Sequence, residues 1–159
     1  MYSPAATWPV KSAGKIFISV PDRCLYVLDA RTGEQLACRE QCAREAIGLS
    51  EDGRTVYTKS MWHRFFAWNA ADASAKWAVE TTAGYEISPT ALVAKDGVVL
   101  MPTDKGNLLA FSASDGSLLW KHKLSIAMVN PLLVWTDQGH LQILASTMDG
   151  TITMLTISL

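Results

Sequence analysis

The stretch DGSLLW, residues 115–120, decides the fold because related stretches recur along the chain at regular intervals. TGEQLA (32–37) keeps the turn residues, and ASAKWA (73–78) keeps the tryptophan. Ala37, Trp77 and Trp120 align at shifts of 40 and 43 residues, and Gly106 and Gly150 align at a shift of 44. A period of this length, present about four times, is typical of β-propeller blades.

Each unit contains four predicted strands. In the third unit they are PTALVAK (89–95), GVVLMPT (97–103), NLLAFSA (107–113) and SLLWKHK (117–123), separated by turn residues such as Asp-Gly. Three tight turns in succession indicate an antiparallel meander. So small a sheet cannot bury both faces alone and must stack on its copies. We therefore expect an all-β fold, a β-propeller of four-stranded antiparallel blades.

We expect residues 1–159 to form a single propeller-repeat domain with about four blades, which is a half or partial propeller. The units lie approximately at residues 1–42, 43–83, 84–126 and 127–159.

Composition and charge exclude several classes of protein. The chain is 49% hydrophobic and 18% charged with a formal net charge of −1, so it is expected to fold in water and shows no electrostatic reason to bind nucleic acid. No apolar run approaches the roughly 18 residues that a membrane span needs, and the first residues lack the pattern of a signal peptide. The compartment stays open: a periplasmic or exported location would follow if a longer parent chain carried a signal peptide.

The cysteines and histidines do not suggest a metal site. Three cysteines leave at least one thiol unpaired, and Cys38 and Cys42 are too far apart along an extended strand, at about 3.3 Å per residue, to bridge without a turn. We expect free structural thiols. No CxxC pair occurs, and the histidines are scattered, at His63, His122 and His140.

One motif carries a family resemblance. AFSASDGSLLW (110–120) resembles the tryptophan-docking motif of PQQ-type β-propeller repeats, whose pattern is Ala-x-Asp-x-x-x-Gly-x-x-x-Trp. Ala110, Gly116 and Trp120 fit this pattern, while Ser112 stands where Asp is usual. The lead-in SPTALVAKDGVVL (88–100) is similar to the same family. The motif implies that the tryptophan packs over the glycine-containing turn of the next blade. A WD40 propeller is disfavoured because no Trp-Asp pair occurs.

The resemblance implies more than one function. Quinoprotein dehydrogenases of this family bind PQQ and calcium through residues that include an adjacent cysteine pair, which this chain lacks, so we expect no cofactor. Other members, such as a propeller lipoprotein of outer-membrane assembly, are scaffolds that bind protein segments. REAIGLSEDGRTVYTKSM (44–61) is similar to propeller halves attached to calcineurin-like metallophosphoesterases, whose metal motifs are absent here.

We therefore expect a non-catalytic binding or scaffold module that engages a protein segment or an adjoining domain. The alternative is the propeller portion of a larger enzyme, a PQQ-dependent dehydrogenase or a metallophosphatase, with its catalytic part outside this chain.

Strand direction predicts where a site would lie. The loops between second and third strands share one end of the propeller with the connections between blades. At this end MWHR (61–64) is the most unusual loop, because it combines an aromatic ring, an imidazole and a guanidinium. An alternative interpretation is that these side chains are merely solvated or cover a neighbouring loop. The expected binding residues are Trp62, His63, Arg64, Arg44, Glu45, Tyr85, Glu86 and Asn130.

Closure of the ring is the last expectation. The fourth unit ends with TITMLTISL (151–159), which reaches a third strand and supplies no counterpart of DGSLLW. An open edge and an apolar face promote association. We expect either a homodimer, in which two four-unit chains form one ring, or a fragment of a longer chain.

Overall fold

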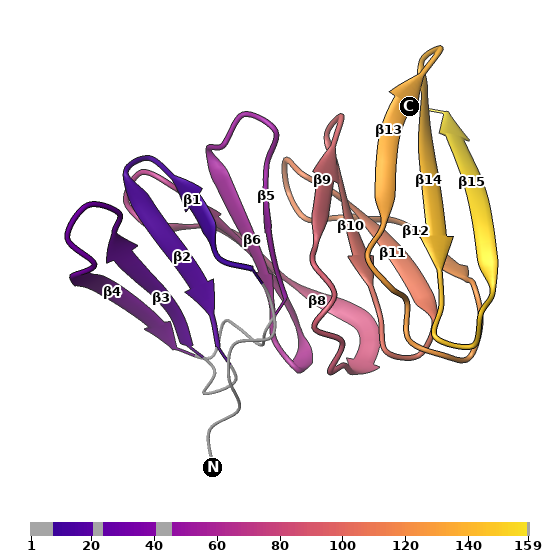
Figure 1. Ribbon diagram of the computed structural model, residues 1–159, viewed down its shortest axis with the longest axis horizontal. Coiled ribbons are helices and arrows are strands. Elements are labelled where there is room, and N and C mark those ends of the chain that lie inside the picture. The colour runs from indigo at the N-terminus through magenta and orange to yellow at the C-terminus, as the bar shows by residue number, and fades with distance from the viewer. Residues whose placement is uncertain (1–7, 21–23, 41–45, 159) are drawn as a thin grey trace.

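The protein is an all-β molecule whose four antiparallel sheets follow one another along the chain (Figure 1). The computed structural model describes residues 8–20, 24–40 and 46–158, and this part of the chain contains strands and no helix. Three sheets have four strands in sequence order, and the fourth sheet has three. The expected propeller of antiparallel blades is confirmed.

The strand bounds of each blade are as follows. The first blade contains β1 (Val10–Ser12), β2 (Lys15–Ser19), β3 (Cys24–Asp29) and β4 (Gln35–Glu40). The second contains β5 (Ile47–Leu49), β6 (Thr55–Lys59), β7 (Trp62–Asn69) and β8 (Ala75–Tyr85). The third contains β9 (Val93–Lys95), β10 (Val98–Pro102), β11 (Asn107–Ser112) and β12 (Leu118–Lys123). The fourth contains β13 (Leu133–Asp137), β14 (His140–Ser146) and β15 (Ile152–Ser158).

Tight turns produce this meander. Asp96 and Gly97 join β9 to β10, and both have positive φ, at 47° and 77°. A two-residue turn with this geometry matches the twist of the strands that it connects, which is why Asp-Gly pairs recur in the sequence. Strand β9 is shorter than the 89–95 expected from the sequence, and the expected segment begins with Pro89, which has no N–H to donate to a ladder.

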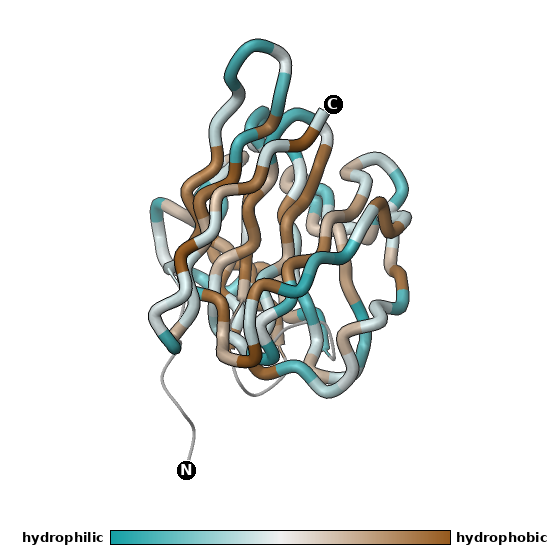
Figure 2. Tube along the Cα trace, turned by 90° about the vertical axis from the view of Figure 1, so that its right-hand side faces the viewer, coloured by the Kyte–Doolittle hydropathy of each residue, from teal (hydrophilic) through white to brown (hydrophobic). Residues whose placement is uncertain are grey.

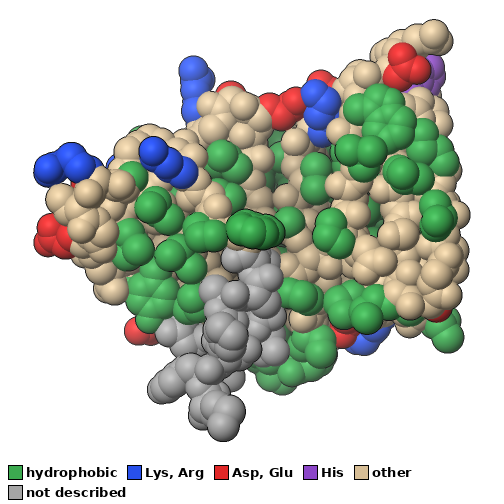
Figure 3. All heavy atoms as spheres, viewed as in Figure 1, with side chains coloured by type: hydrophobic (Ala, Val, Ile, Leu, Met, Phe, Trp, Pro, Cys, Tyr) green, Lys and Arg blue, Asp and Glu red, His purple; other side chains and the backbone are tan. Residues whose placement is uncertain are grey.

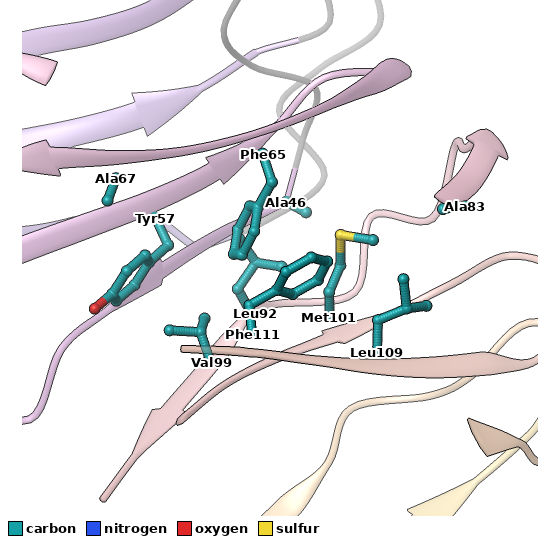
Figure 4. Packing of buried hydrophobic residues seen from close by; sticks show 10 residues of the cluster. All are labelled: Ala46, Tyr57, Phe65, Ala67, Ala83, Leu92, Val99, Met101, Leu109 and Phe111. Atoms are coloured by element: carbon teal, nitrogen blue, oxygen red, sulfur yellow. The ribbon is translucent and has the colours of Figure 1, made fainter. Parts of the chain in front are cut away.

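The hydrophobic core lies between successive blades, in three clusters. Hydropathy follows this arrangement, with apolar residues along the strands and polar residues at the turns (Figure 2). Figure 4 shows the cluster between the second and third blades, where the rings of Phe65 and Phe111 lie 4.8 Å apart and both side chains are buried. Each seam is built from the facing sides of two blades, so one blade is not a stable unit by itself.

At the seam between the second and third blades, the large side chain belongs to the second blade. Trp77 of β8 packs against Phe65, with ring centroids 5.3 Å apart, and its indole Nε1 donates a hydrogen bond to the carbonyl of Ala113 at 3.1 Å. A Cβ added at Gly116 would lie 2.7 Å from the Trp77 ring. The turn of the third blade therefore needs a glycine where the indole lies.

The seam between the first and second blades reverses this distribution. Ala37 occupies the position in β4 that Trp77 occupies in β8, and it packs on a cluster that contains Trp68 and Ala73 of the second blade. Ala73 stands at the position of Gly116 and has a left-handed φ of 57°. The turn thus carries the methyl group of Ala73 where the facing strand β4 has the small side chain of Ala37.

Two of the cysteines are bonded to each other, which differs from the expectation of free thiols. Cys24 and Cys38 form a disulfide, with Cα atoms 5.9 Å apart, where free thiols were expected. The reason is that β3 and β4 pair antiparallel, with Cys24 opposite Glu40 and Cys38 opposite Tyr26, which places the cysteines diagonally across the two strands. Cys42 lies outside the described residues.

Candidate functional site

Two exposed aromatic rings form the centre of the candidate site. Trp62 begins β7 and Tyr85 ends β8, and the two residues are opposite each other in the register of these strands. Their ring centroids lie 5.1 Å apart in an edge-to-face arrangement. Trp62 is 54% exposed and Tyr85 43% exposed, so the pair presents an ordered aromatic surface to solvent.

A β-bulge shapes the loop that carries this pair. The register of β7 and β8 shifts between Trp62 and Arg64, and His63, which lies within the shift, has a φ of 65°. Such a conformation is uncommon outside glycine and costs energy unless its surroundings fix it. The hydroxyl of Ser60 accepts hydrogen bonds from the backbone N–H groups of Trp62 and Arg64, at 3.2 and 3.3 Å. The bulge is therefore held from within the turn.

Cationic side chains lie beside the start of β7 and the end of β8. The Arg64 guanidinium carbon lies 5.1 Å from the centroid of the Phe66 ring, and Arg64 itself is exposed. The Lys105 ammonium donates to the carbonyl of Tyr85 at 2.8 Å, and Lys123 donates to the carbonyl of Lys105. The Lys105 contact brings positive charge from the third blade to the backbone of Tyr85 in the second.

Glu86 lies behind this surface rather than on it. Its carboxylate is 2.8 Å from the Lys59 ammonium, and each side chain is 2% exposed. The carboxylate also accepts hydrogen bonds from the backbone N–H groups of Ser88 at 2.8 Å and of Asp104 at 3.0 Å. Burial raises the pKa of Glu86 above its ordinary value, and the neighbouring Lys59 opposes that rise.

This ion pair connects the blades under the aromatic pair. Lys59 ends β6 of the second blade, Glu86 follows β8, and Asp104 lies in the β10–β11 turn of the third. The backbone N–H of Glu86 also donates to the carbonyl of Met61 at 3.2 Å, which holds the end of β8 beside the start of β7. The ion pair and this backbone hydrogen bond together anchor Glu86, the residue that follows Tyr85.

Asn130 is not in this cluster. Asn130 is half-buried and bonds to Ser146 of the fourth blade, through its backbone N–H at 2.8 Å and its side-chain amide at 3.1 Å. Arg44 and Glu45 lie outside the described residues, so a carboxylate pair of Glu45 with Glu86 stays a prediction.

Asn130 instead borders a hollow on the face that carries the first strand of each blade, namely β1, β5, β9 and β13. Hydrophobic side chains form a band across this face (Figure 3). The hollow has a volume of about 550 Å³, and its lining is mainly apolar and comes from all four blades, including Trp8, Ile47, Leu92, Met128 and Pro131.

Sequence reasoning missed the two lysines of the site. Lys59 looks like an ordinary solvated residue at the end of an apolar strand, TVYTK (55–59), and nothing in the sequence pairs it with Glu86. The contact of Lys105 with the carbonyl of Tyr85 depends on the packing of two blades, which no single stretch of sequence shows. Among the described residues, no three metal-ligating side chains gather in one place, and no helix could span a membrane.

Comparisons with known proteins agree with the observed fold. A family model described as outer membrane protein assembly factor BamB matches residues 80–157. Outer membrane protein assembly factor BamB of Moranella endobia (strain PCIT) is 29% identical over 133 residues, which are 77% of this chain and 34% of that protein. The repeats of this chain are thus similar to PQQ-like β-propeller repeats, with the family match covering residues 80–157.

Solved structures show how much of a propeller these PQQ-like repeats represent. The crystal structure of BamB from Moraxella catarrhalis has a TM-score of 0.73 at 12% identity and covers all of this chain with 50% of its own length. The computationally designed Ika4 protein has a TM-score of 0.79 at 18% identity, with 98% of this chain and 92% of that chain covered. The chain thus spans about half the length of one of these solved structures, nearly all of the other, and about a third of the curated relative.

Proposed function

We propose that this chain is a non-catalytic propeller module that binds a protein segment through the surface formed by Trp62, His63, Arg64 and Tyr85. The observation that carries the proposal is the exposed edge-to-face pair of Trp62 and Tyr85, 5.1 Å between ring centroids. Tryptophan, tyrosine and arginine are the residues that most often anchor protein interfaces. Because both aromatic side chains are already fixed, binding costs little side-chain entropy.

The buried ion pair supports this function. A charged pair under a surface is weak evidence for stability, since desolvation offsets much of its attraction. Its hydrogen bonds, however, fix the two loops that carry the aromatic rings. The Lys59–Glu86 pair therefore acts as a positioning element for the binding surface.

The relatives suggest the setting. A curated relative and a solved structure similar in fold are both named BamB, the relative as an outer membrane protein assembly factor. We infer that this chain has a function of the same kind, as a scaffold in the cell envelope. The Cys24–Cys38 disulfide supports an oxidising compartment such as the periplasm, because disulfides rarely persist in the cytosol.

An exposed apolar face on the fourth blade supports association of two copies. The fourth blade exposes Leu133, Leu144, Ile152 and Met154, at 60, 38, 73 and 50%. We infer that two copies close one ring by packing this face on the first blade of the partner. Light scattering at micromolar concentration tests it: twice the chain mass of 17.4 kDa is expected, and a monodisperse monomer contradicts the dimer.

The binding surface is tested by affinity capture from an envelope extract of the source cell. The amount of partner captured by the double variant Trp62→Ala with Arg64→Ala should be at least tenfold lower than the amount captured by the wild type. The matched control is Arg31→Ala with Leu36→Ala, which removes an exposed arginine and a half-exposed apolar residue from the first blade. Equal capture by both double variants would remove the surface from consideration. The alternative, an enzyme whose catalytic part lies elsewhere, is tested by reading the genomic frame for a dehydrogenase or phosphoesterase segment.

A further inference from the structure

The exposed aromatic pair continues into a third apolar side chain, Ile87. Tyr85 and Ile87 are 43% and 40% exposed, whereas Glu86 between them is buried. Alternate side chains of an extended segment point to the same side. Ile87 therefore extends the surface of Trp62 and Tyr85 into an apolar strip that runs from the second blade into its connection with the third.

Two exposed lysines of the third blade lie beside this apolar strip. The Lys105 ammonium donates to the carbonyl of Tyr85 at 2.8 Å, and the Lys123 ammonium donates to the carbonyl of Lys105. In the described part of the chain, neither ammonium forms an ion pair with a carboxylate. Asp104 is next to Lys105 in sequence, but its Oδ1 is buried and its backbone N–H donates to Glu86. Two positive charges therefore reach the surface without a neutralising carboxylate among the described residues.

This positive charge is a local feature. The whole chain has a formal net charge of −1, so it does not attract acidic partners in general. Arg64 contributes less than the two lysines because Glu80 is opposite it in the register of β7 and β8. Uncompensated cations at the rim of an apolar surface favour partners of opposite charge.

The surface also does not depend on where the chain begins or ends. Its residues belong to the second and third blades and to the connection between them, and both blades have four strands. The first and fourth blades of the same chain lie on either side of these two (Figure 1).

We propose that the partner at this surface is an acidic protein segment, whose apolar residue packs on the apolar strip and whose carboxylates pair with Lys105 and Lys123. This inference rests on the proposed function, because it names the kind of segment that Trp62 and Tyr85 bind. Every second side chain of an extended segment faces the surface that it lies on. The carboxylates are therefore expected at alternate positions next to the apolar residue.

Selection from a phage-displayed library of random nonapeptides tests the proposal. The wild-type chain should enrich peptides in which an aromatic or aliphatic residue is followed by acidic residues at alternate positions. The variant Lys105→Gln with Lys123→Gln should lose the acidic preference. Its affinity for the best wild-type peptide, measured by fluorescence anisotropy, should fall by about tenfold, because exposed charge pairs each contribute modestly.

Two further variants control for charge and folding, and circular dichroism checks that each variant is folded. Lys105→Arg with Lys123→Arg keeps both positive charges and should keep the acidic preference. Lys11→Gln with Lys15→Gln removes the same charge from the first blade and should leave the selected peptides unchanged. A loss of acidic preference in this first-blade variant would assign the preference to net charge and overturn the proposal.

The outcomes separate this inference from the proposed function. Peptides that are lost with Trp62→Ala plus Arg64→Ala, but show no acidic preference, would leave the binding surface standing and overturn the acidic partner. If the wild type enriches no peptide, or if enrichment survives that double variant, both proposals fall. Binding to phosphatidylglycerol vesicles that requires Lys105 and Lys123, with no acidic peptide selected, would assign the cations to a lipid surface and overturn the acidic segment.

Discussion

Replacing Gly116 by alanine should destabilise the protein far more than the same change at Gly33. The two glycines occupy equivalent turns, with nearly equal left-handed φ values of 77° and 76°. They differ in what a new Cβ would meet: at Gly33 nothing lies within 4 Å, whereas at Gly116 the Trp77 ring lies at 2.7 Å and Val79 at 2.9 Å. The pair therefore separates backbone strain from a clash between blades.

The magnitudes follow from the two contributions. A non-glycine residue in the left-handed region costs roughly 1 kcal/mol after the reduced freedom of the unfolded chain is counted. Inserting a methyl group into a filled seam adds about 1–3 kcal/mol. Gly33→Ala should thus lower the free energy of unfolding by about 1 kcal/mol, and Gly116→Ala by about 2–4 kcal/mol. For a chain of this size, the difference corresponds to roughly 3–10 °C in melting temperature.

Urea unfolding followed by circular dichroism measures both losses, with thermal unfolding as a second measurement. A double-mutant cycle adds the decisive control: in a Trp77→Ala background, Gly116→Ala should cost clearly less than in the wild type, because the clashing ring is gone and only Val79 stays close to the new Cβ. Equal losses for the two glycine variants in the wild-type background would refute the account of the seam. So would an undiminished cost of Gly116→Ala in the Trp77→Ala background.

Three further predictions concern other parts of the fold. Trp120→Ala should lower stability clearly, by up to the 3–5 kcal/mol seen for buried tryptophans, whereas the exposed Trp62→Ala should change it by less than about 1 kcal/mol; equal melting temperatures would contradict this assignment of packing. Glu86→Gln should lower the free energy of unfolding by up to about 3–5 kcal/mol because it removes the carboxylate charge 2.8 Å from the buried Lys59 ammonium, while replacing both residues by apolar ones should recover much of that loss in urea unfolding. Hydrogen bonds from the Thr147 hydroxyl and the Thr151 backbone lower the pKa of Asp149 to about 2, so its contribution is complete above pH 4 and is lost as the pH falls toward 2; Asp149→Asn should flatten the acid limb of the stability curve, and an unchanged limb would contradict the shift.

The fold could be predicted because its information is local and repeated. Alternating apolar residues give the strands, and Asp-Gly pairs give the turns. The spacing of Trp77 and Trp120 gives the blades. Each of these signals spans fewer residues than one blade, and they occur several times, so an irregular copy such as the first unit did not hide the period.

The candidate site could be predicted only where it depends on one loop. MWHR is unusual as a stretch of sequence, and its Trp62 packs edge-to-face on Tyr85 in the structure. The burial of Glu86, by contrast, depends on Lys59, 27 residues earlier, and on a turn of the next blade. The Cys24–Cys38 disulfide was missed for the same reason: reasoning from spacing along one strand does not consider residues that meet across two strands.

The unequal seams have a consequence for how the chain reaches its native order. Repeated units of similar sequence risk docking on the wrong neighbour during folding, a known failure of repeat proteins. If β4 packed against the third blade instead of the second, the small Ala37 would face Gly116 and leave a void where an indole belongs. Both native pairings match large with small, and the skipped pairing does not. The blade that carries the large side chain differs between the two seams, and this difference distinguishes adjacent blades from distant ones. Units of this chain therefore cannot be shuffled or deleted without changing residues on both sides of the new junction.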